Sequence, residues 1–158
     1  MGKKYELKYL TEDFYKKYNS VDYPEIENKK ERPYMVMLIK IENNTFAIPF
    51  RTNVKHNACY RFKNSLRNTQ SSTGLDYSKT VIINDATYLG NTATIDNKEY
   101  IELNSKYYFI MKQFSSYLNG YKKFINGKLN EYEAKKYQFS TLRYFHDELE
   151  IEAEQVAK

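Results

Sequence analysis

The spacing of the apolar residues changes near residue 105, and this change limits the chain to one fold class. Before residue 105, apolar residues occur in short alternating or continuous runs of strand length. After it, they recur at every third and fourth position, which is the pattern of an amphipathic helix. These positions are Tyr107, Ile110, Met111, Phe114, Tyr117, Leu118, Tyr121, Phe124 and Ile125. Strands followed by helices predict an α+β fold, a compact bent antiparallel sheet with packed helices and a helical C-terminal half.

The helical half contains recognisable start and stop signals. We expect the long helix to be capped by Asn104 or Ser105 and to end near Asn126-Gly127. A second helix is predicted over residues 130–137. A third is predicted over residues 141–155, with Ser140 as its N-cap.

The first half reads as strands joined by turns. Residues 4–10 alternate apolar and charged side chains, as an edge strand does, and Thr11 is a suitable N-cap for a short helix to about residue 19. Residues 34–41 and 45–50 predict a hairpin around Asn43-Asn44. Within the second of these strands, Pro49 predicts departure from the ladder, because proline has no backbone N–H to donate.

The remaining segments give weaker signals. Residues 51–79 have almost no periodic apolar pattern and predict a long loop, a feature that is often functional. Residues 80–84 predict a short buried strand, and residues 88–100 predict turns with a short hairpin around Asp96-Asn97. With no internal repeat or interdomain linker, residues 1–158 are expected to form one domain.

Composition excludes several classes of protein. With 41% hydrophobic residues, the chain is not disordered, and a single cysteine excludes a disulfide framework or a Cys-rich zinc site. No apolar run approaches the roughly 20 residues of a membrane helix, and no apolar stretch follows the N-terminal lysines, so we expect a cytoplasmic protein. Phosphate-loop, dinucleotide-binding, esterase and metalloprotease motifs are absent, so we expect neither a cofactor nor a metal.

The net charge of +5 combines two opposite regions. Residues 147–158 contain five acids and one base, which leaves +9 on the rest of the chain. Residues 51–75 contain five bases and no acid, whereas uniform spacing would place about three acids there. Such a segment attracts polyanions, because neutralising phosphates releases counterions. Alternatively, the segment is a solvated loop, and the abundance of Lys, Asn and Tyr reflects an AT-rich genome.

One run of residues, from Pro49 to Asn57, gathers groups suited to phosphoryl chemistry on RNA. RNA carries its own nucleophile, the 2′-hydroxyl, so an enzyme needs only to orient it, exchange its proton and stabilise the pentacovalent phosphate. Arg51 and Lys55 are suited to hold the phosphate charge, Thr52 to contact a phosphate oxygen or the 2′-hydroxyl, and His56 to exchange protons. The alternatives are a structural histidine and a solvated lysine.

Further residues are predicted to bind RNA through charge or base stacking. Arg32 and Tyr34 precede the first long strand, although Tyr34 also suits the core. The other residues predicted to bind RNA are Asn53, Arg61, Lys63 and Arg67 in the basic segment and Lys112 and Gln113 on the long helix.

The order of these motifs resembles a known family. Arg32-Pro33-Tyr34 leads into an apolar strand, then Phe46 to Thr52 into a Lys/His loop, then Gly74 to Lys79 into Val81-Ile82-Ile83, with an aromatic Lys-Gln helix after it. This order, over roughly residues 5–124, resembles the toxins of type III toxin–antitoxin systems, the ToxN/AbiQ family, and within it the CptN and TenpN groups.

The resemblance implies a metal-independent endoribonuclease with a Kid/MazF-like bent sheet, an SH3-like barrel. Such toxins cut RNA by 2′-hydroxyl attack and leave a 2′,3′-cyclic phosphate and a 5′-hydroxyl. Their antitoxin is a small repeat-derived RNA pseudoknot, which they cut from its precursor and keep bound in a closed ring, and some members abort phage infection.

Individual residues match the family pattern to different degrees. Thr52 matches the family's strand-end hydroxyl residue, Lys55 its following lysine and Arg32 its basic residue before the first long strand. Arg51 departs from the pattern, because the ToxN branch has a second hydroxyl residue there. His56 follows a family tendency to a histidine in this loop.

Two other functions fit the same residues. A non-catalytic RNA-binding module would use the same basic loop without cleavage. A phage structural or adaptor protein would owe its basic character to codon usage alone.

Overall fold

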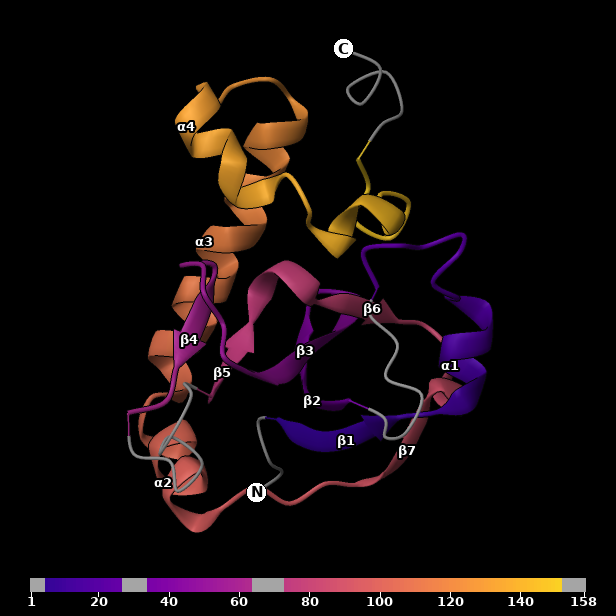
Figure 1. Cartoon of the computed structure of the whole chain (residues 1–158), viewed down its shortest axis with the longest axis vertical. Helices are drawn as coiled ribbons and strands as arrows, with labels where there is room; N and C mark the ends of the chain where they lie inside the picture. Colours follow the sequence, from indigo (N-terminus) through magenta and orange to yellow (C-terminus); the bar gives the residue numbers. More distant parts are fainter. Residues whose placement is uncertain (1–4, 27–33, 64–72, 152–158) are drawn as a thin grey trace.

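The computed structural model describes residues 5–26, 34–63 and 73–151. In these ranges the chain forms an antiparallel sheet of seven strands (Figure 1). Their order is β4-β5-β3-β2-β1-β7, and β6 pairs with β3 beside this path. The strands are β1 Glu6–Leu10, β2 Met35–Ile41, β3 Asn44–Thr52, β4 Cys59–Arg61, β5 Thr73–Asp76, β6 Val81–Ile83 and β7 Leu89–Thr92.

Four α-helices accompany this open sheet, so the predicted α+β class is confirmed. They are α1 Glu12–Lys17, α2 Asn97–Ser105, α3 Tyr107–Ile125 and α4 Glu131–Ala134. Short 3₁₀ turns cover residues 77–79, 86–88, 135–137 and 141–144. In Figure 1, α3 runs along the side of the molecule where β4 and β5 lie, and α4 packs near its C-terminal end. Among the described residues, none of the helices has the length and apolar character needed to cross a membrane.

The core lies between the sheet and α3. Phe46 of β3 meets Phe114 of α3 edge to face, with ring centroids 5.2 Å apart. The apolar positions of α3 bury Ile110, Phe114, Tyr117, Leu118 and Tyr121, as its helical period predicts. The helix ends at Asn126, and Gly127 adopts a left-handed φ of 69°, a C-terminal signal that glycine accommodates without strain.

Several predicted boundaries are confirmed by side-chain caps. The Thr11 hydroxyl accepts from the Phe14 amide at the start of α1. Asn130 and Glu133 form a reciprocal capping box at α4. The Ser140 hydroxyl accepts from the Leu142 amide, as expected for an N-cap.

Pro49 marks the point where β3 changes neighbours. Before it, β3 pairs with β2 and, on its other side, with β6 through Thr45–Ala47. After it, Phe50, Arg51 and Thr52 pair with Leu75, Gly74 and Thr73 of β5. The prediction was therefore half right, because β3 leaves β2 after Pro49 but continues as a strand in a second ladder.

Three predicted segments differ from the structure. The loop predicted over residues 51–79 contains β4, β5 and a 3₁₀ turn, because β5 pairs with both β3 and β4. The hairpin predicted at Asp96-Asn97 is the start of α2, where the Asp96 carboxylate accepts from the Glu99 amide at 2.8 Å. Consequently α3 follows α2 after Lys106, without the predicted Asn104 or Ser105 cap.

The third predicted helix, over residues 141–155, is also wrong where the chain is described. Only Thr141–Tyr144 is helical, as a 3₁₀ turn, and turns follow to residue 150. Leu142, Phe145 and Leu149 enter the core at helical spacing, but Glu150 takes a left-handed φ of 58°, which an α-helix cannot include. The last acidic residues, 152–158, lie outside the described residues.

Candidate functional site

The end of β3 presents Arg51 and Thr52 where the strand passes into the loop to β4. Arg51 and Thr52 stand opposite Gly74 and Thr73 of β5. The preceding residues of β3 from Phe46 to Phe50 are buried, so the core fixes the end of this strand. Thr52 is exposed, whereas the Arg51 side chain is 26% exposed.

A buried carboxylate organises the groups around this strand end. Asp76, at the end of β5, has no exposed surface. Its Oδ2 accepts from Arg51 Nη1 at 2.8 Å, and its Oδ1 lies 3.2 Å from His56 Nε2. The same Oδ1 accepts from the Ser78 hydroxyl at 2.6 Å and from the Ser78 amide at 3.0 Å. We call Asp76, Arg51, His56 and Ser78 the carboxylate cluster.

The cluster keeps the Asp76 carboxyl ionised despite its burial. Burial disfavours the charged form, but hydrogen bonds from His56, Ser78 and Arg51 and the nearby His56 charge act in the opposite direction. The result is a pKa for Asp76 below its ordinary value. A buried aspartate is thus kept negative by groups that it also holds in place.

The contacts of His56 indicate its tautomer. Its Nδ1 accepts from the Ala58 amide at 3.1 Å, so Nδ1 carries no proton in the neutral ring. The proton therefore resides on Nε2, which faces Asp76 and Ser78. With 44% of its side chain exposed, His56 joins the buried carboxylate to the surface. A further proton would enter at Nδ1, and the resulting imidazolium would face the Asp76 charge.

The loop that carries His56 is held by contacts from β4. Arg61 Nη2 donates to the carbonyl oxygens of Val54 at 2.8 Å and of His56 at 2.7 Å. The buried Cys59 thiol donates to the same His56 carbonyl at 3.3 Å. Arg61, predicted to bind RNA, thus shapes the loop in this structure. Asn53 begins the loop with a left-handed φ of 58°.

Helix α2 anchors the outer end of β4 through a buried glutamate. Glu102 Oε2 accepts from the Tyr60 hydroxyl at 2.5 Å, and both carboxylate oxygens accept from the Lys63 amide, at 2.9 and 3.0 Å. The Lys63 side chain is exposed. Edge strand β4 is therefore tied to a helix as well as to β5.

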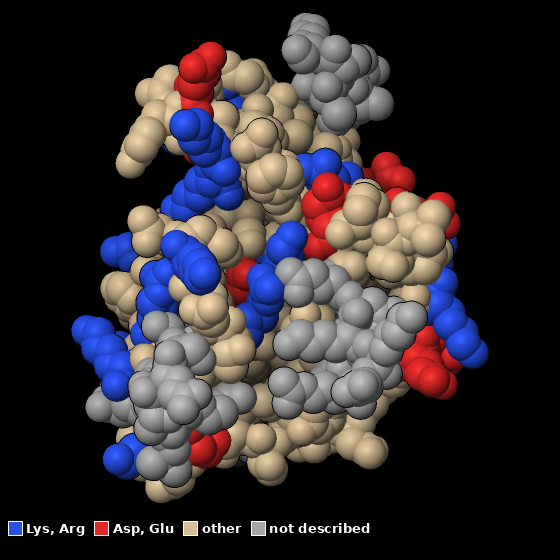
Figure 2. Space-filling model, in the orientation of Figure 1, with Lys and Arg blue, Asp and Glu red and all other residues tan. Residues whose placement is uncertain are grey.

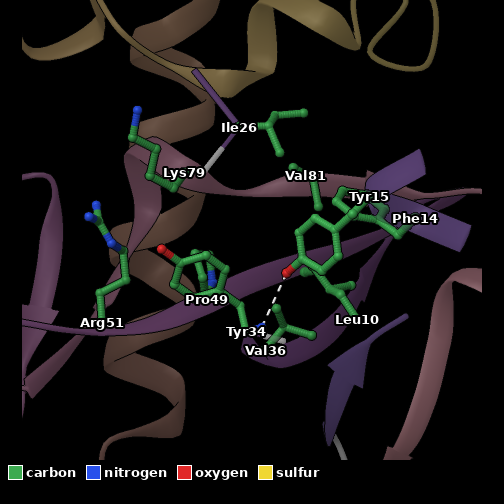
Figure 3. Close-up of a pocket in the computed structure, with 11 residues that line it drawn as sticks. Leu10, Phe14, Tyr15, Ile26, Tyr34, Val36, Pro49, Arg51, Lys79 and Val81 are labelled. Carbon is green, nitrogen blue, oxygen red and sulfur yellow. Dashed lines mark hydrogen bonds between the residues drawn. The ribbon is translucent and has the colours of Figure 1, made fainter. Parts of the chain in front are cut away.

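A small cavity of about 30 Å³ lies on the other side of Arg51 (Figure 3). Its walls are mostly apolar, with Arg51 and Lys79 at one end. In Figure 3 the Tyr34 ring lies beside Pro49 with its hydroxyl toward these two cations. The Tyr15 hydroxyl accepts from the Tyr34 amide at 3.1 Å, so Tyr34 is built into the wall and is half-buried.

A larger cleft, of about 360 Å³, opens beside the carboxylate cluster. Asn57 and Tyr77, the chain neighbours of His56 and Asp76, line one side of it. The cleft is also lined by α3, including Lys112 and Gln113, and by Lys136 from the 3₁₀ turn over residues 135–137. Figure 2 shows Lys and Arg side chains gathered over α3, β4 and β5, whereas Asp and Glu lie mainly toward α1 and the C-terminal turns.

The structure brings together many of the predicted site residues. Arg51 and His56 both contact Asp76, whereas Thr52 at the end of β3 and Asn53 and Lys55 on the following loop are exposed. Lys112 and Gln113 line the same cleft as Asn57. Predicted residues Arg32 and Arg67 lie outside the described residues.

Sequence reasoning missed the centre of the site, Asp76, and its companion Ser78. The signal was an Asp-x-Ser sequence directly after the acid-free segment, which is the pattern of a side-chain-capped turn. Asn57 in the cleft ended the predicted run from Pro49 but was given no role of its own, and Lys136 was missed. These residues are ordinary surface types, and only the tertiary fold brings them together.

Comparison with protein families, curated proteins and solved structures finds no match to this chain. Within the described residues, no three His, Cys, Asp or Glu side chains are grouped to hold a metal ion.

Proposed function

We propose that this protein is a metal-independent endoribonuclease toxin. The observation that carries the proposal is the carboxylate cluster, in which buried Asp76 holds Arg51 and His56 at the strand end that exposes Thr52 and Lys55. Cationic, hydroxyl and imidazole groups at one strand end are what in-line attack by a 2′-hydroxyl requires. The resemblance to ToxN/AbiQ toxins gives the same reaction.

The geometry suggests a role for each group. The 2′-oxygen loses its proton and forms a bond to phosphorus as the bond from phosphorus to the 5′-oxygen breaks. The departing 5′-oxygen takes a proton from solvent, which yields a 2′,3′-cyclic phosphate and a 5′-hydroxyl. Arg51 and Lys55 stabilise the additional negative charge on the phosphate, and Thr52 orients a phosphate oxygen or the nucleophile. His56 accepts the 2′-proton at Nδ1 in exchange for its Ala58 contact, and Asp76 stabilises the imidazolium through Nε2.

A small RNA is the proposed inhibitor. The basic surface over α3, β4 and β5 supports RNA as a partner, and the resemblance supports a repeat-derived pseudoknot bound in a closed toxin–RNA ring. Action on cellular RNA places the proposed activity in the cytoplasm. Tandem repeats upstream of the gene, followed by a terminator, would support this part of the proposal, and their absence would count against it.

The decisive experiment is cleavage of single-stranded RNA by purified protein in EDTA. We expect cleavage with 2′,3′-cyclic phosphate ends, and a loss of about 10²-fold or more in the rate for Thr52→Ala and Lys55→Ala. Lys123→Ala, an exposed charge on α3 outside the cleft, is the matched control and should cleave at the wild-type rate.

Two results would contradict the proposal. Activity that disappears in EDTA and returns with a divalent ion would show that the reaction depends on a metal. Wild-type protein that binds RNA without cleaving it, with affinity unchanged by Thr52→Ala, would indicate the alternative function, a non-catalytic RNA-binding module.

A further inference from the structure

The cleft beside the carboxylate cluster has the size and chemistry of a site for one nucleotide. Its volume of about 360 Å³ lies at the lower end of the roughly 300–1,000 Å³ of small-ligand pockets. A duplex is far larger than such a space. None of the described residues that line it is an Asp or Glu, whereas Lys112 and Lys136 stand at its sides. A ligand with at least one negative charge fits this lining.

One face of α3 supplies most of the cleft wall. Phe109, Lys112, Gln113 and Ser116 follow one another at helical spacings of three, one and three residues, which places them on one side of the helix. Phe109 is 51% exposed, although its ring also contacts the Tyr60 ring at a centroid distance of 6.1 Å. A large, half-exposed aromatic ring on the wall of a cleft is a surface on which a planar base can stack.

Two carboxamides line the cleft, Asn57 from the His56 loop and Gln113 from α3. The Tyr77 hydroxyl donates to Gln113 Oε1 at 2.9 Å, which fixes the orientation of this amide and leaves its Nε2 group as the donor. Carboxamides provide donors and acceptors that match the edges of bases. Peptide carboxylates or bare phosphates would require charge but not this pairing of an aromatic ring with amides.

We propose that this cleft binds one unpaired nucleobase of the RNA, from a nucleotide next to the phosphate held at the carboxylate cluster. In this arrangement Phe109 stacks on the base, Gln113 and Asn57 contact its edge, and Lys112 and Lys136 hold the flanking phosphates. The position follows from the chain, because Asn57 adjoins His56 and Tyr77 lies between Asp76 and Ser78. The proposal rests on RNA being the ligand of the site, and it gives the enzyme a sequence preference.

Binding to a non-cleavable RNA tests this inference independently of catalysis. The probe is the tightest-binding member of a random pool of single strands of about seven nucleotides, with 2′-fluoro riboses that lack the nucleophile. Each position in turn is then made abasic, and affinity is measured by fluorescence anisotropy. We expect one position at which loss of the base weakens binding about tenfold or more.

Variants then assign that base to the cleft. Phe109→Ala and Gln113→Ala should each weaken binding of the intact strand, and Tyr132→Ala, an exposed aromatic outside the cleft, is the control that should not. In Phe109→Ala, removal of the critical base should cost little further affinity, because the stacking partner is already lost. Thermal unfolding of each variant confirms that it is folded.

The inference would be overturned by an abasic scan with no sensitive position, or by equal losses in wild type and Phe109→Ala. Binding that depends on salt and on Lys112 but on no base would mean that the cleft recognises charge alone. A protein that fails to cleave RNA but shows the coupled loss would refute the proposed nuclease activity and leave the base site in place.

Discussion

Substitution of Asp76 by asparagine tests whether the buried carboxylate holds the site together. The change keeps the size of the side chain but removes its charge and replaces one acceptor oxygen by a donor. Arg51 loses its partner at 2.8 Å and His56 Nε2 its partner at 3.2 Å, in a place with no exposed surface at Asp76. Removing one member of a buried ion pair costs about 3–5 kcal/mol.

The partial exposure of Arg51 puts the expected loss at the lower end of that range. Its guanidinium can recover some hydration, so we expect the free energy of unfolding to fall by about 3 kcal/mol. For a chain of this length, that loss lowers the melting temperature by about 6–12 °C. Urea unfolding followed by circular dichroism measures the first quantity, and a thermal scan measures the second.

Asp85→Asn is a closely matched control. Asp85 caps a 3₁₀ turn through the Thr87 amide at 2.9 Å and hydroxyl at 2.7 Å, as Asp76 does through Ser78. Asp85 is exposed, however, and asparagine is as good an N-cap as aspartate. The control should therefore retain wild-type stability. Comparison of the two variants isolates the contribution of burial and of the Arg51 and His56 contacts.

The pH dependence provides the refutation. Because the pKa of Asp76 is lowered in the folded protein, its contribution is complete above the unfolded pKa of about 4 and is lost as pH falls through the lower folded value. The stability difference between wild type and Asp76→Asn should persist from pH 7 to about 4 and shrink below it. An equally stable variant, or a difference that does not shrink, would refute the reasoning.

Two other predictions concern close contacts and a second histidine. In Gly74→Ala, the new Cβ would lie 2.6 Å from the Tyr60 carbonyl oxygen, so urea unfolding should show that the free energy of unfolding falls by about 1–3 kcal/mol. In Gly90→Ala the nearest contact is at 3.3 Å, so this control should lose less stability. Equal losses in the two variants would contradict the prediction. Burial lowers the pKa of His146, which contacts the Tyr121 hydroxyl at 2.6 Å, so the unfolded chain binds its proton more readily. Stability should therefore fall as pH drops from about 7 through the folded pKa of His146. His146→Gln should reduce that decline. A variant with the same pH profile as the wild type would show that His146 does not cause the decline.

The elements that the sequence predicts well are those with a clear period or cap. The hairpin of β2 and β3 and the length of α3 follow from apolar spacing, because their buried faces are continuous. Thr11, Asn130 and Ser140 mark starts because their caps involve neighbouring residues only. Interactions between neighbouring residues, such as these caps, can be predicted from a single sequence.

The elements that were missed depend on distant pairing. Strand β5 is fully buried although its sequence is Thr-Gly-Leu-Asp, because Gly74 permits close approach to β4 and the Asp76 charge is neutralised from β3 and the loop. The partners of Asp76, Arg51 and His56, lie 25 and 20 positions earlier in the chain. Contacts between residues so far apart in the chain leave no periodic pattern in the sequence. The basic segment thus pointed to the region of the carboxylate cluster but not to the carboxylate that organises it.

The exchange of neighbours at Pro49 gives the site two walls of different stiffness. Arg51 and Thr52 pair with β5 and continue a strand whose residues from Phe46 to Phe50 are buried, so the core sets their positions. The His56 loop precedes β4, an edge strand of three residues held by Arg61 and Glu102. A ligand that enters between them meets a rigid wall, the end of β3, and a more adjustable wall, the His56 loop. In the proposed endoribonuclease, RNAs that differ in shape would be accommodated by the His56 loop while Arg51 keeps its position.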